Sequence, residues 1–199
     1  MGLVLLAAGA STRLGHPKQL LPFHGATLLR HMAEVALASP CRPVAVVLGY
    51  EAERMAREIS DLEVAVIVEP GWNAGQGRSL SAGLGALLAS HPSLSAVIVM
   101  LVDQPAVTSA HLAALVRLHQ RGAHSIVTSA YDETYGVPAL FGQEHFPTLL
   151  KLEGPHGARH VIRHASATIA SVPLPGGDFD VDLAEDLARL YEPNSNFRR

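Results

Sequence analysis

The sequence predicts an α/β protein built on a single doubly wound, mainly parallel sheet flanked by helices. Short apolar runs alternate along the chain with longer helical stretches, which is the order expected of repeated strand–helix units. The apolar runs are continuous, as is typical of parallel strands that are buried on both faces. Sheets of this kind bind ligands beyond the carboxyl ends of their strands, where the strand order switches.

The first strand is predicted from the apolar run that begins at Leu3, and it leads into a glycine loop. Further strands are predicted at residues 44–48, 64–68, 96–102, 125–129 and 167–172. Helices are predicted at residues 26–38, 52–59, 80–89, 110–120 and 157–164. A last helix is predicted at residues 183–190, with Asp182 as its N-cap. This order places the glycine loop and the end of the 96–102 strand on the same edge of the sheet.

The composition is that of a globular chain with one substantial core. The chain has 199 residues, of which 48% are hydrophobic and 17% are charged. We expect one domain over residues 1–191, followed by a flexible polar tail over residues 192–199. The formal net charge of −3 argues against a nucleic-acid-binding surface, so an anionic ligand must be held by a local site.

The N-terminal apolar run is predicted to be a strand and not a signal peptide. No Lys or Arg precedes it, and it is too short to span a membrane. The single cysteine, Cys41, cannot form an internal disulfide, which fits a reducing compartment. We therefore expect a cytoplasmic protein that does not bind membranes.

The loop after the first strand has the features of a phosphate site. Gly9 and Gly15 permit positive φ and close approach of a ligand, and backbone N–H groups beyond a strand are free to point at an anion. Arg13 can hold phosphate oxygens in a fork, while Lys18 supplies a point charge. The spacing matches neither a P-loop nor GxGxxG, so an ordinary turn with two solvated cations remains an alternative.

Two acidic segments are candidates for a metal site. Asp103 directly follows the 96–102 strand, and it is either a Mg²⁺ ligand or a turn aspartate. Near the C-terminus, Asp178, Asp180 and Asp182 would share one side of an extended segment. Their mutual repulsion calls for a nearby cation, unless the segment is a solvated acidic loop.

A second glycine loop enters a helix within residues 73–81. Gly75 and Gly77 would let the backbone approach a flat ligand, and Ser79 could cap the helix. A plain strand-to-helix turn has the same spacing, so both interpretations stay open.

Three histidines, His156, His160 and His164, recur every four residues, so a helix would bring them to one face. Three imidazoles could bind zinc. Arg159 and Arg163 lie in the same segment, however, and they favour a solvated basic face.

Four stretches of the sequence resemble the MobA-like NTP transferase family. Residues 6–22, LAAGASTRLGHPKQLLP, resemble its LAAGxSxRxGxxKxLLP motif, and residues 103–105, DQP, resemble its metal-binding DxP. Residues 73–81 resemble its N…GxxxSLxxG segment, and residues 180–187 resemble its DIDTPEDL. Within the family, the chain looks closest to the molybdopterin cytidylyltransferases. The resemblance implies a Rossmann-like fold of the nucleotide-diphospho-sugar transferase type.

The resemblance also implies Mg²⁺-dependent transfer of CMP from CTP to molybdopterin, with release of pyrophosphate. It implies a nucleotide site made of Leu6, Ala7, Ala8, Gly9, Ser11, Thr12, Arg13, Lys18, Gly77, Ser79 and Asp103. Of these, Lys18, Arg13 and Asp103 would be catalytic, and Asp103 and Asp182 would hold Mg²⁺. Cytidylyl members tend to read LAAG and guanylyl members LAGG, so Ala8 implies CTP as the donor.

Two segments depart from the family on the acceptor side. Val137 replaces the histidine of the family's GHPvLF, and Pro155 replaces the aspartate of its GDxGAR. The alternatives are guanylyl transfer to the same cofactor, or nucleotidyl transfer to another phosphorylated metabolite. A further alternative is a non-catalytic nucleotide-binding chaperone of a molybdenum enzyme, and a molybdenum hydroxylase is a candidate client.

Overall fold

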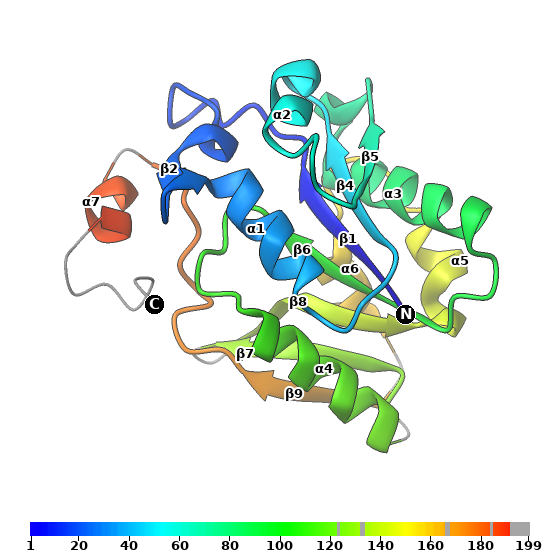
Figure 1. Cartoon of the computed structure of the whole chain (residues 1–199). Coiled ribbons are helices and arrows are strands. Elements are labelled where there is room, and N and C mark those ends of the chain that lie inside the picture. Colours follow the sequence, from blue (N-terminus) through cyan, green and yellow to red (C-terminus); the bar gives the residue numbers. More distant parts are fainter. Residues whose placement is uncertain (123, 132–133, 166–167, 184, 192–199) are drawn as a thin grey trace.

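The computed structural model describes residues 1–122, 124–131, 134–165, 168–183 and 185–191 (Figure 1). A seven-stranded sheet in the order β5-β4-β1-β6-β8-β7-β9 forms its centre. Its strands are β1 (Gly2–Ala7), β4 (Val44–Leu48), β5 (Ala65–Val68), β6 (Ala96–Leu101), β7 (Ile126–Tyr131), β8 (Thr134–Gly142) and β9 (Ile169–Pro173). A separate antiparallel hairpin is formed by β2 (Pro22–Phe23) and β3 (Ala26–Thr27).

Helices cover both faces of the sheet (Figure 1). On one face lie α1 (Leu28–Leu37), α2 (Ala52–Glu58) and α4 (Ser109–Arg121), and on the other lie α3 (Gln76–Ser90), α5 (Phe146–Leu149) and α6 (Ala158–His164). The remaining helices are α7 (Asp186–Tyr191) and the short η1 (Lys18–Leu20), η2 (Trp72–Ala74) and η3 (Gln143–His145). Among the described residues, no helix has the length and apolar character needed to cross a membrane.

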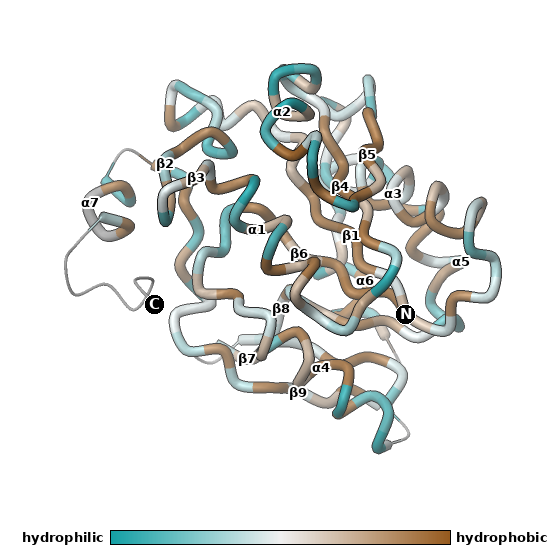
Figure 2. Tube along the Cα trace, viewed as in Figure 1, coloured by the Kyte–Doolittle hydropathy of each residue, from teal (hydrophilic) through white to brown (hydrophobic). Residues whose placement is uncertain are grey.

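Strands β1, β4 and β6 are apolar along their whole length (Figure 2). Every residue of β1 and β4 is buried. In β1, Leu3 and Leu5 pack into the core beneath α1, α2 and α4, whereas Val4 and Leu6 pack into the core beneath α3, α5 and α6. Because alternate side chains enter two different cores, the sequence of such a strand is a continuous apolar run.

Strand pairing confirms a mainly parallel sheet. β1 is parallel to both β4 and β6, and the pairs β4–β5 and β7–β9 are parallel as well. The sequence does not predict β8, which runs antiparallel between β6 and β7. This strand contains Gly136 and Pro138, residues typical of turns, so it lacks the unbroken apolar run of the parallel strands.

Two predicted helix starts are wrong. α3 begins at Gln76, so Ser79 lies inside its first turn and does not cap it. α7 begins at Asp186, and Asp182 is not its N-cap. Instead, the Asp186 side chain points back toward the residues before α7, where its carboxylate accepts hydrogen bonds from the N–H groups of Asp182 and Leu183.

Other boundaries shift by a few residues. The predicted helix at 26–38 begins at Leu28, where Thr27 caps it by accepting a hydrogen bond from the N–H of Arg30. The predicted strand at 64–68 becomes β5, which lies at the sheet edge, so Val68 is 58% exposed and not buried on both faces. Residue 167, which begins the last predicted strand, and the tail at 192–199 lie outside the described residues.

His111 packs α4 against the sheet in its neutral form. Its Nε2 lies 2.8 Å from the Ser129 hydroxyl in β7, and the residue is buried. Burial lowers the pKa of His111 to about 4. The imidazole is therefore uncharged in the folded protein at neutral pH.

Acidification is expected to destabilise the fold through His111. An unfolded histidine takes up a proton at about pH 6.5, whereas His111 in the folded protein does so only at about pH 4. Between these two pH values the unfolded state therefore binds more protons than the folded state. This contribution is complete above about pH 6.5 and falls by roughly 3 kcal/mol as the pH drops to about 4. Urea unfolding at about pH 7.5 and 4.5 should show a smaller acid-induced loss in His111→Gln than in the wild type; equal losses would contradict this.

Candidate active site

The site lies at the carboxyl ends of β1 and β6, on the same edge as the sequence predicts. β1 is flanked by β4 on one side and β6 on the other, which is the switch in strand order where such sheets bind ligands. The N–H of Val102 donates to the Leu6 carbonyl across these ends at 3.1 Å. A pocket of about 310 Å³ opens there, and the predicted site residues that line it are Leu6, Ala7, Ala8, Gly9, Lys18, Ser79 and Asp103.

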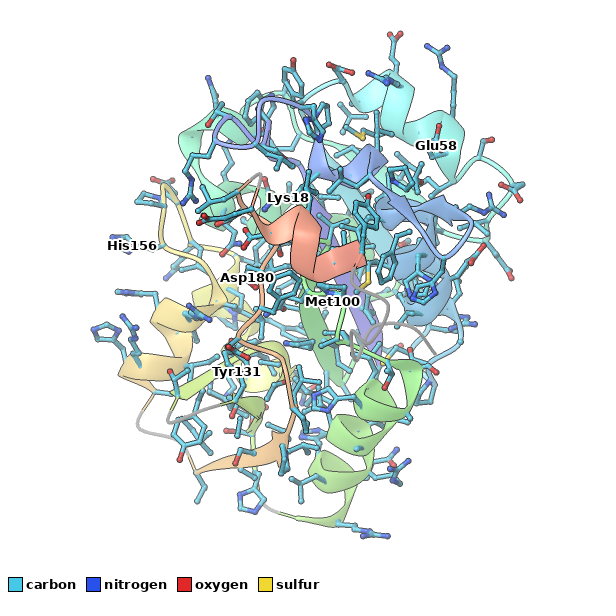
Figure 3. The ribbon with its side chains drawn as sticks, turned by 90° about the vertical axis from the view of Figure 1, so that its left-hand side faces the viewer. Lys18, Glu58, Met100, Tyr131, His156 and Asp180 are labelled. Atoms are coloured by element: carbon cyan, nitrogen blue, oxygen red, sulfur yellow. The ribbon has the colours of Figure 1, made fainter. Side chains whose placement is uncertain are left out.

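Lys18 stands at the centre of a charged cluster on this edge (Figure 3). Its Nζ donates to Asp103 Oδ2 and to Asp182 Oδ1, both at 2.6 Å. Arg13 Nη2 donates to the other carboxylate oxygen of Asp182 at 2.9 Å. The structure thus brings together the four charged residues that the sequence assigns to catalysis and metal binding.

The cluster keeps Lys18 and Asp182 ionised. Burial lowers the pKa of Lys18, but the charge of Asp103 and the hydrogen bonds to both carboxylates outweigh it and raise that pKa above its ordinary value. Burial raises the pKa of Asp182, but Lys18 and Arg13 outweigh it and lower that pKa. The Lys18 side chain is only 11% exposed, so its charge depends on both partners.

Two contacts bring the C-terminal segment to the end of β6. The N–H of Val181 donates to the Asp103 carbonyl at 3.1 Å. The buried Gln104 side chain donates from Nε2 to the Gly177 carbonyl at 3.3 Å. These contacts hold the segment beside β6, and Asp182 therefore reaches the cluster from a distant part of the chain.

A buried glutamine, not expected from the sequence pattern, shapes the loop after β1. Gln19 donates from Nε2 to the carbonyls of Ala7 and Gly9, at 2.8 and 2.7 Å. Gln19 follows Lys18 in η1, so these two hydrogen bonds also help to position the Lys18 ammonium group. Its signal in the sequence is weak, because a glutamine beside a cation is equally typical of an exposed turn.

Ser11 holds the rest of the loop after β1 through three hydrogen bonds. Its carbonyl accepts hydrogen bonds from the N–H groups of Leu14 and Gly15, and its hydroxyl accepts one from the N–H of Lys18 at 3.1 Å. Ser11 and Gly15 have positive φ angles of 52° and 80°. Gly9 does not, contrary to expectation; the space beside it is open, so its contribution is room for a ligand.

The other predicted nucleotide-site residues do not line the pocket: Ser11, Thr12, Arg13 and Gly77. Thr12 and Arg13 are exposed at the loop tip. The N–H of Gly77 donates to the Gly154 carbonyl at 3.1 Å, so this glycine faces the segment that carries Pro155.

The contact between the loop before α3 and residues 153–157 requires glycine at position 75. The φ of Gly75 is +124°, and a β-carbon on it would lie 2.2 Å from the Gly154 carbonyl oxygen. A β-carbon on Gly77 would lie 2.5 Å from the His156 carbonyl oxygen. The loop before α3 therefore packs backbone to backbone against residues 153–157, which joins the donor pocket to the predicted acceptor side.

Asp103 offers an oxygen suited to a divalent cation. Its Oδ1 is buried and has no hydrogen-bond partner among the described residues. Mg²⁺ often takes one or two carboxylates and completes its shell with phosphate oxygens and waters, so Asp103 and Asp182 fit such an ion. No three or more His, Cys, Asp or Glu in the described part of the chain are arranged to hold a metal by themselves.

Asp180 is a further acid beside the cluster (Figure 3). Burial raises its pKa to about 6, with a further contribution from the charge of Asp103, and the charge of Arg159 opposes the shift. Its Oδ1 is buried without a hydrogen-bond partner in the described ranges. Asp178, the third acid of the segment, is exposed to solvent.

The rings of the three histidines lie next to one another, with His160 and His164 on α6 and His156 just before it. The ring centroids of His156 and His160 are 4.8 Å apart, and those of His160 and His164 are 4.2 Å apart. His164 Nδ1 lies 2.8 Å from the His160 carbonyl oxygen. They are not among any described set of three or more metal-ligating side chains placed around one ion.

Comparison with known proteins places the chain in a family. A family model of the MobA-like NTP transferase domain matches residues 3–169. Nicotine blue oxidoreductase of Paenarthrobacter nicotinovorans is 32% identical over 196 residues, which cover 94% of each chain. Purine catabolism protein PucB of Bacillus subtilis (strain 168) is 31% identical over 198 residues, which cover 92% of each chain.

Solved structures of similar proteins have the same fold. Rv0371c of Mycobacterium tuberculosis H37Rv has a TM-score of 0.79 at 29% identity, and the match covers 96% of this chain and 97% of that one. A second structure of Rv0371c, a complex with manganese, has a TM-score of 0.78 at 28% identity and covers 95% and 96%. The fold is the predicted nucleotide-diphospho-sugar transferase type, and the family depends on divalent metal. The chain therefore belongs to the MobA-like NTP transferase family and is a nucleotidyltransferase.

Proposed function

We propose that the chain transfers CMP from CTP to the terminal phosphate of molybdopterin, with release of pyrophosphate. The observation that carries this proposal is the Lys18 ammonium group, fixed by Asp103 and Asp182 beside a pocket whose β1 wall is small and apolar. A triphosphate needs cations and metal-ligating carboxylates, whereas a nucleoside needs narrow apolar walls. One pocket offers both.

In this reaction an oxygen of the acceptor phosphate attacks the α-phosphorus of CTP, and the bond to the β-phosphate breaks. Two of the three ammonium hydrogens of Lys18 bond Asp103 and Asp182, and the third would donate to an α-phosphate oxygen. Arg13, whose side chain is 70% exposed, would hold the β- and γ-phosphates with the backbone N–H groups of residues 8–12. Bound at Asp103 and Asp182, Mg²⁺ would neutralise charge on the triphosphate.

The acceptor side keeps one cation and lacks one histidine. Val137, in the place of the family's histidine, is buried in the core and offers no polar contact. Arg159 donates to the Tyr131 hydroxyl at 2.7 Å, and its charge acts on the nearby Asp180. A guanidinium group beside the carboxylate cluster supports a phosphorylated acceptor, and the choice of molybdopterin rests on the motif resemblance.

A second candidate function is a redox reaction with a nucleotide cofactor. The observation that favours it is that one relative aligned over nearly the whole chain is named an oxidoreductase. The same pocket would then hold the nucleotide part of NADH or NADPH, and the charged cluster would hold its phosphates.

The deciding experiment measures pyrophosphate release from CTP and from GTP with purified molybdopterin and Mg²⁺. Pyrophosphate release from CTP that requires the acceptor supports the proposal. No release from CTP would contradict it, whether or not GTP reacts. A parallel melting-temperature screen adds NADH and NADPH, because a ligand that binds only the folded state raises the melting temperature. Stabilisation by NADPH or NADH and not by CTP would favour the redox candidate.

The Asp103→Asn variant is expected to lower turnover on the order of a hundredfold or more with the fold intact. The change keeps the size of the side chain and its ability to accept a hydrogen bond from Lys18, but it removes the charge that faces the metal. Steady-state turnover at saturating Mg²⁺ is the measurement, and a cooperative melting transition verifies that the variant folds. Turnover near the wild-type value would remove Asp103 from the metal site.

The Ala8→Gly variant tests base choice. Ala8 lines the pocket, and its β-carbon takes room that a purine needs more than a pyrimidine does. Such a steric effect is worth roughly 1–3 kcal/mol, or about 10–200-fold in the ratio of kcat/KM for CTP to that for GTP. We expect the wild type to prefer CTP and Ala8→Gly to lose part of that preference. An unchanged ratio would leave the preference without this cause.

A further inference from the structure

The chain's one tryptophan, Trp72, lines the pocket. Trp72 begins η2, in the loop between β5 and α3. It contacts Gly49, directly after β4, whereas Asp103 is the second residue after β6. β4 and β6 flank β1, so the two strand ends next to the aromatic and the charged sides of the pocket are two strand spacings, or about 10 Å, apart.

Two neighbours hold the indole ring in place. A β-carbon on Gly49 would lie 2.4 Å from Trp72 Cγ, so the indole rests directly on glycine backbone. The Tyr50 ring meets the indole edge to face, with centroids 5.8 Å apart and an interplanar angle of 71°. The N–H of Tyr50 also donates to the Ala8 carbonyl at 3.0 Å, which ties this aromatic pair to the β1 wall of the pocket.

The turn that carries Trp72 is also fixed. Its N–H donates to the Glu69 carbonyl at 3.2 Å. The Glu69 carboxylate is buried, and its Oε1 accepts hydrogen bonds from the N–H of Gly71 at 2.7 Å and from Arg78 Nε at 2.9 Å. The indole is therefore positioned before any ligand arrives, which reduces the entropy that binding must overcome.

A pre-positioned aromatic ring on one side of a pocket, with a cation and carboxylates on the other, suits a ligand with a flat π-system and a phosphate chain. We propose that Trp72 is the platform on which the nucleobase of the donor stacks. This inference rests on the proposed nucleotide-transfer function and adds to it the group that binds the base. Stacking accepts any base, because every base has a π-face, so Trp72 provides affinity and leaves base choice to other residues such as Ala8.

The fluorescence of Trp72 provides a direct test, because no other tryptophan contributes to the signal. Titration with CTP and Mg²⁺ should quench or shift the emission, and the same titration with inorganic tripolyphosphate, which has the charge without a base, should not. Calorimetry run in parallel reports binding independently of the fluorophore. CTP that binds by calorimetry without any change in emission would overturn the role of Trp72 and leave the transfer function standing. The absence of CTP binding by calorimetry would overturn both.

Substitutions separate stacking from packing. Trp72→Ala should weaken CTP and GTP by a similar factor, roughly 5- to 150-fold, and leave their ratio unchanged. Trp72→Phe keeps a π-face and should bind more tightly than Trp72→Leu, which fills space without one. Ile169→Ala, an exposed apolar truncation on the far edge strand β9, is the matched control and should bind as the wild type does. Equal affinities in Trp72→Phe, Trp72→Leu and the wild type would overturn the proposal, and melting temperatures verify that each variant folds.

Discussion

The site depends on one largely buried cation, the ammonium group of Lys18, held between Asp103 and Asp182. The two carboxylates come from parts of the sequence far from Lys18 and from each other. A buried charge left without its partner costs about 3–5 kcal/mol, so the loop after β1, the end of β6 and the C-terminal segment are stable only when they meet. The interaction that closes the fold at this edge is therefore the same one that assembles the charges for chemistry.

Two buried glutamines hold the backbone around that cluster. Gln19 ties the loop after β1 to itself, and Gln104 ties the C-terminal segment to the end of β6. Each amide donates to carbonyl groups at or beyond the ends of strands, where the sheet offers fewer partners. The Gly75 and Gly77 contacts with residues 153–157 extend the same framework to the acceptor side. The backbone around the site is thus held largely by hydrogen bonds to main-chain groups.

Much of the fold was predictable because local pattern and tertiary environment agree. β1, β4 and β6 are continuous apolar runs since both of their faces are buried, and Asp103 stands out because it follows such a run. β8 was not predictable, because its glycines and proline belong to an antiparallel strand defined by its neighbours. The contact of Lys18 with Asp182 spans 164 positions, so only the family motif pointed to it. Trp72 gave no signal, because an aromatic residue before a glycine loop is equally typical of a turn.

A crystal structure of the protein with CTP and Mn²⁺, with the metal located by its anomalous scattering, would test the role of Lys18 directly. We expect the triphosphate within hydrogen-bonding distance of Lys18 Nζ and the metal beside the Asp103 carboxylate. We also expect the cytosine to lie against the indole of Trp72. A nucleotide bound elsewhere, or a triphosphate that leaves Lys18 in contact with its two carboxylates alone, would contradict the central role given to this cation.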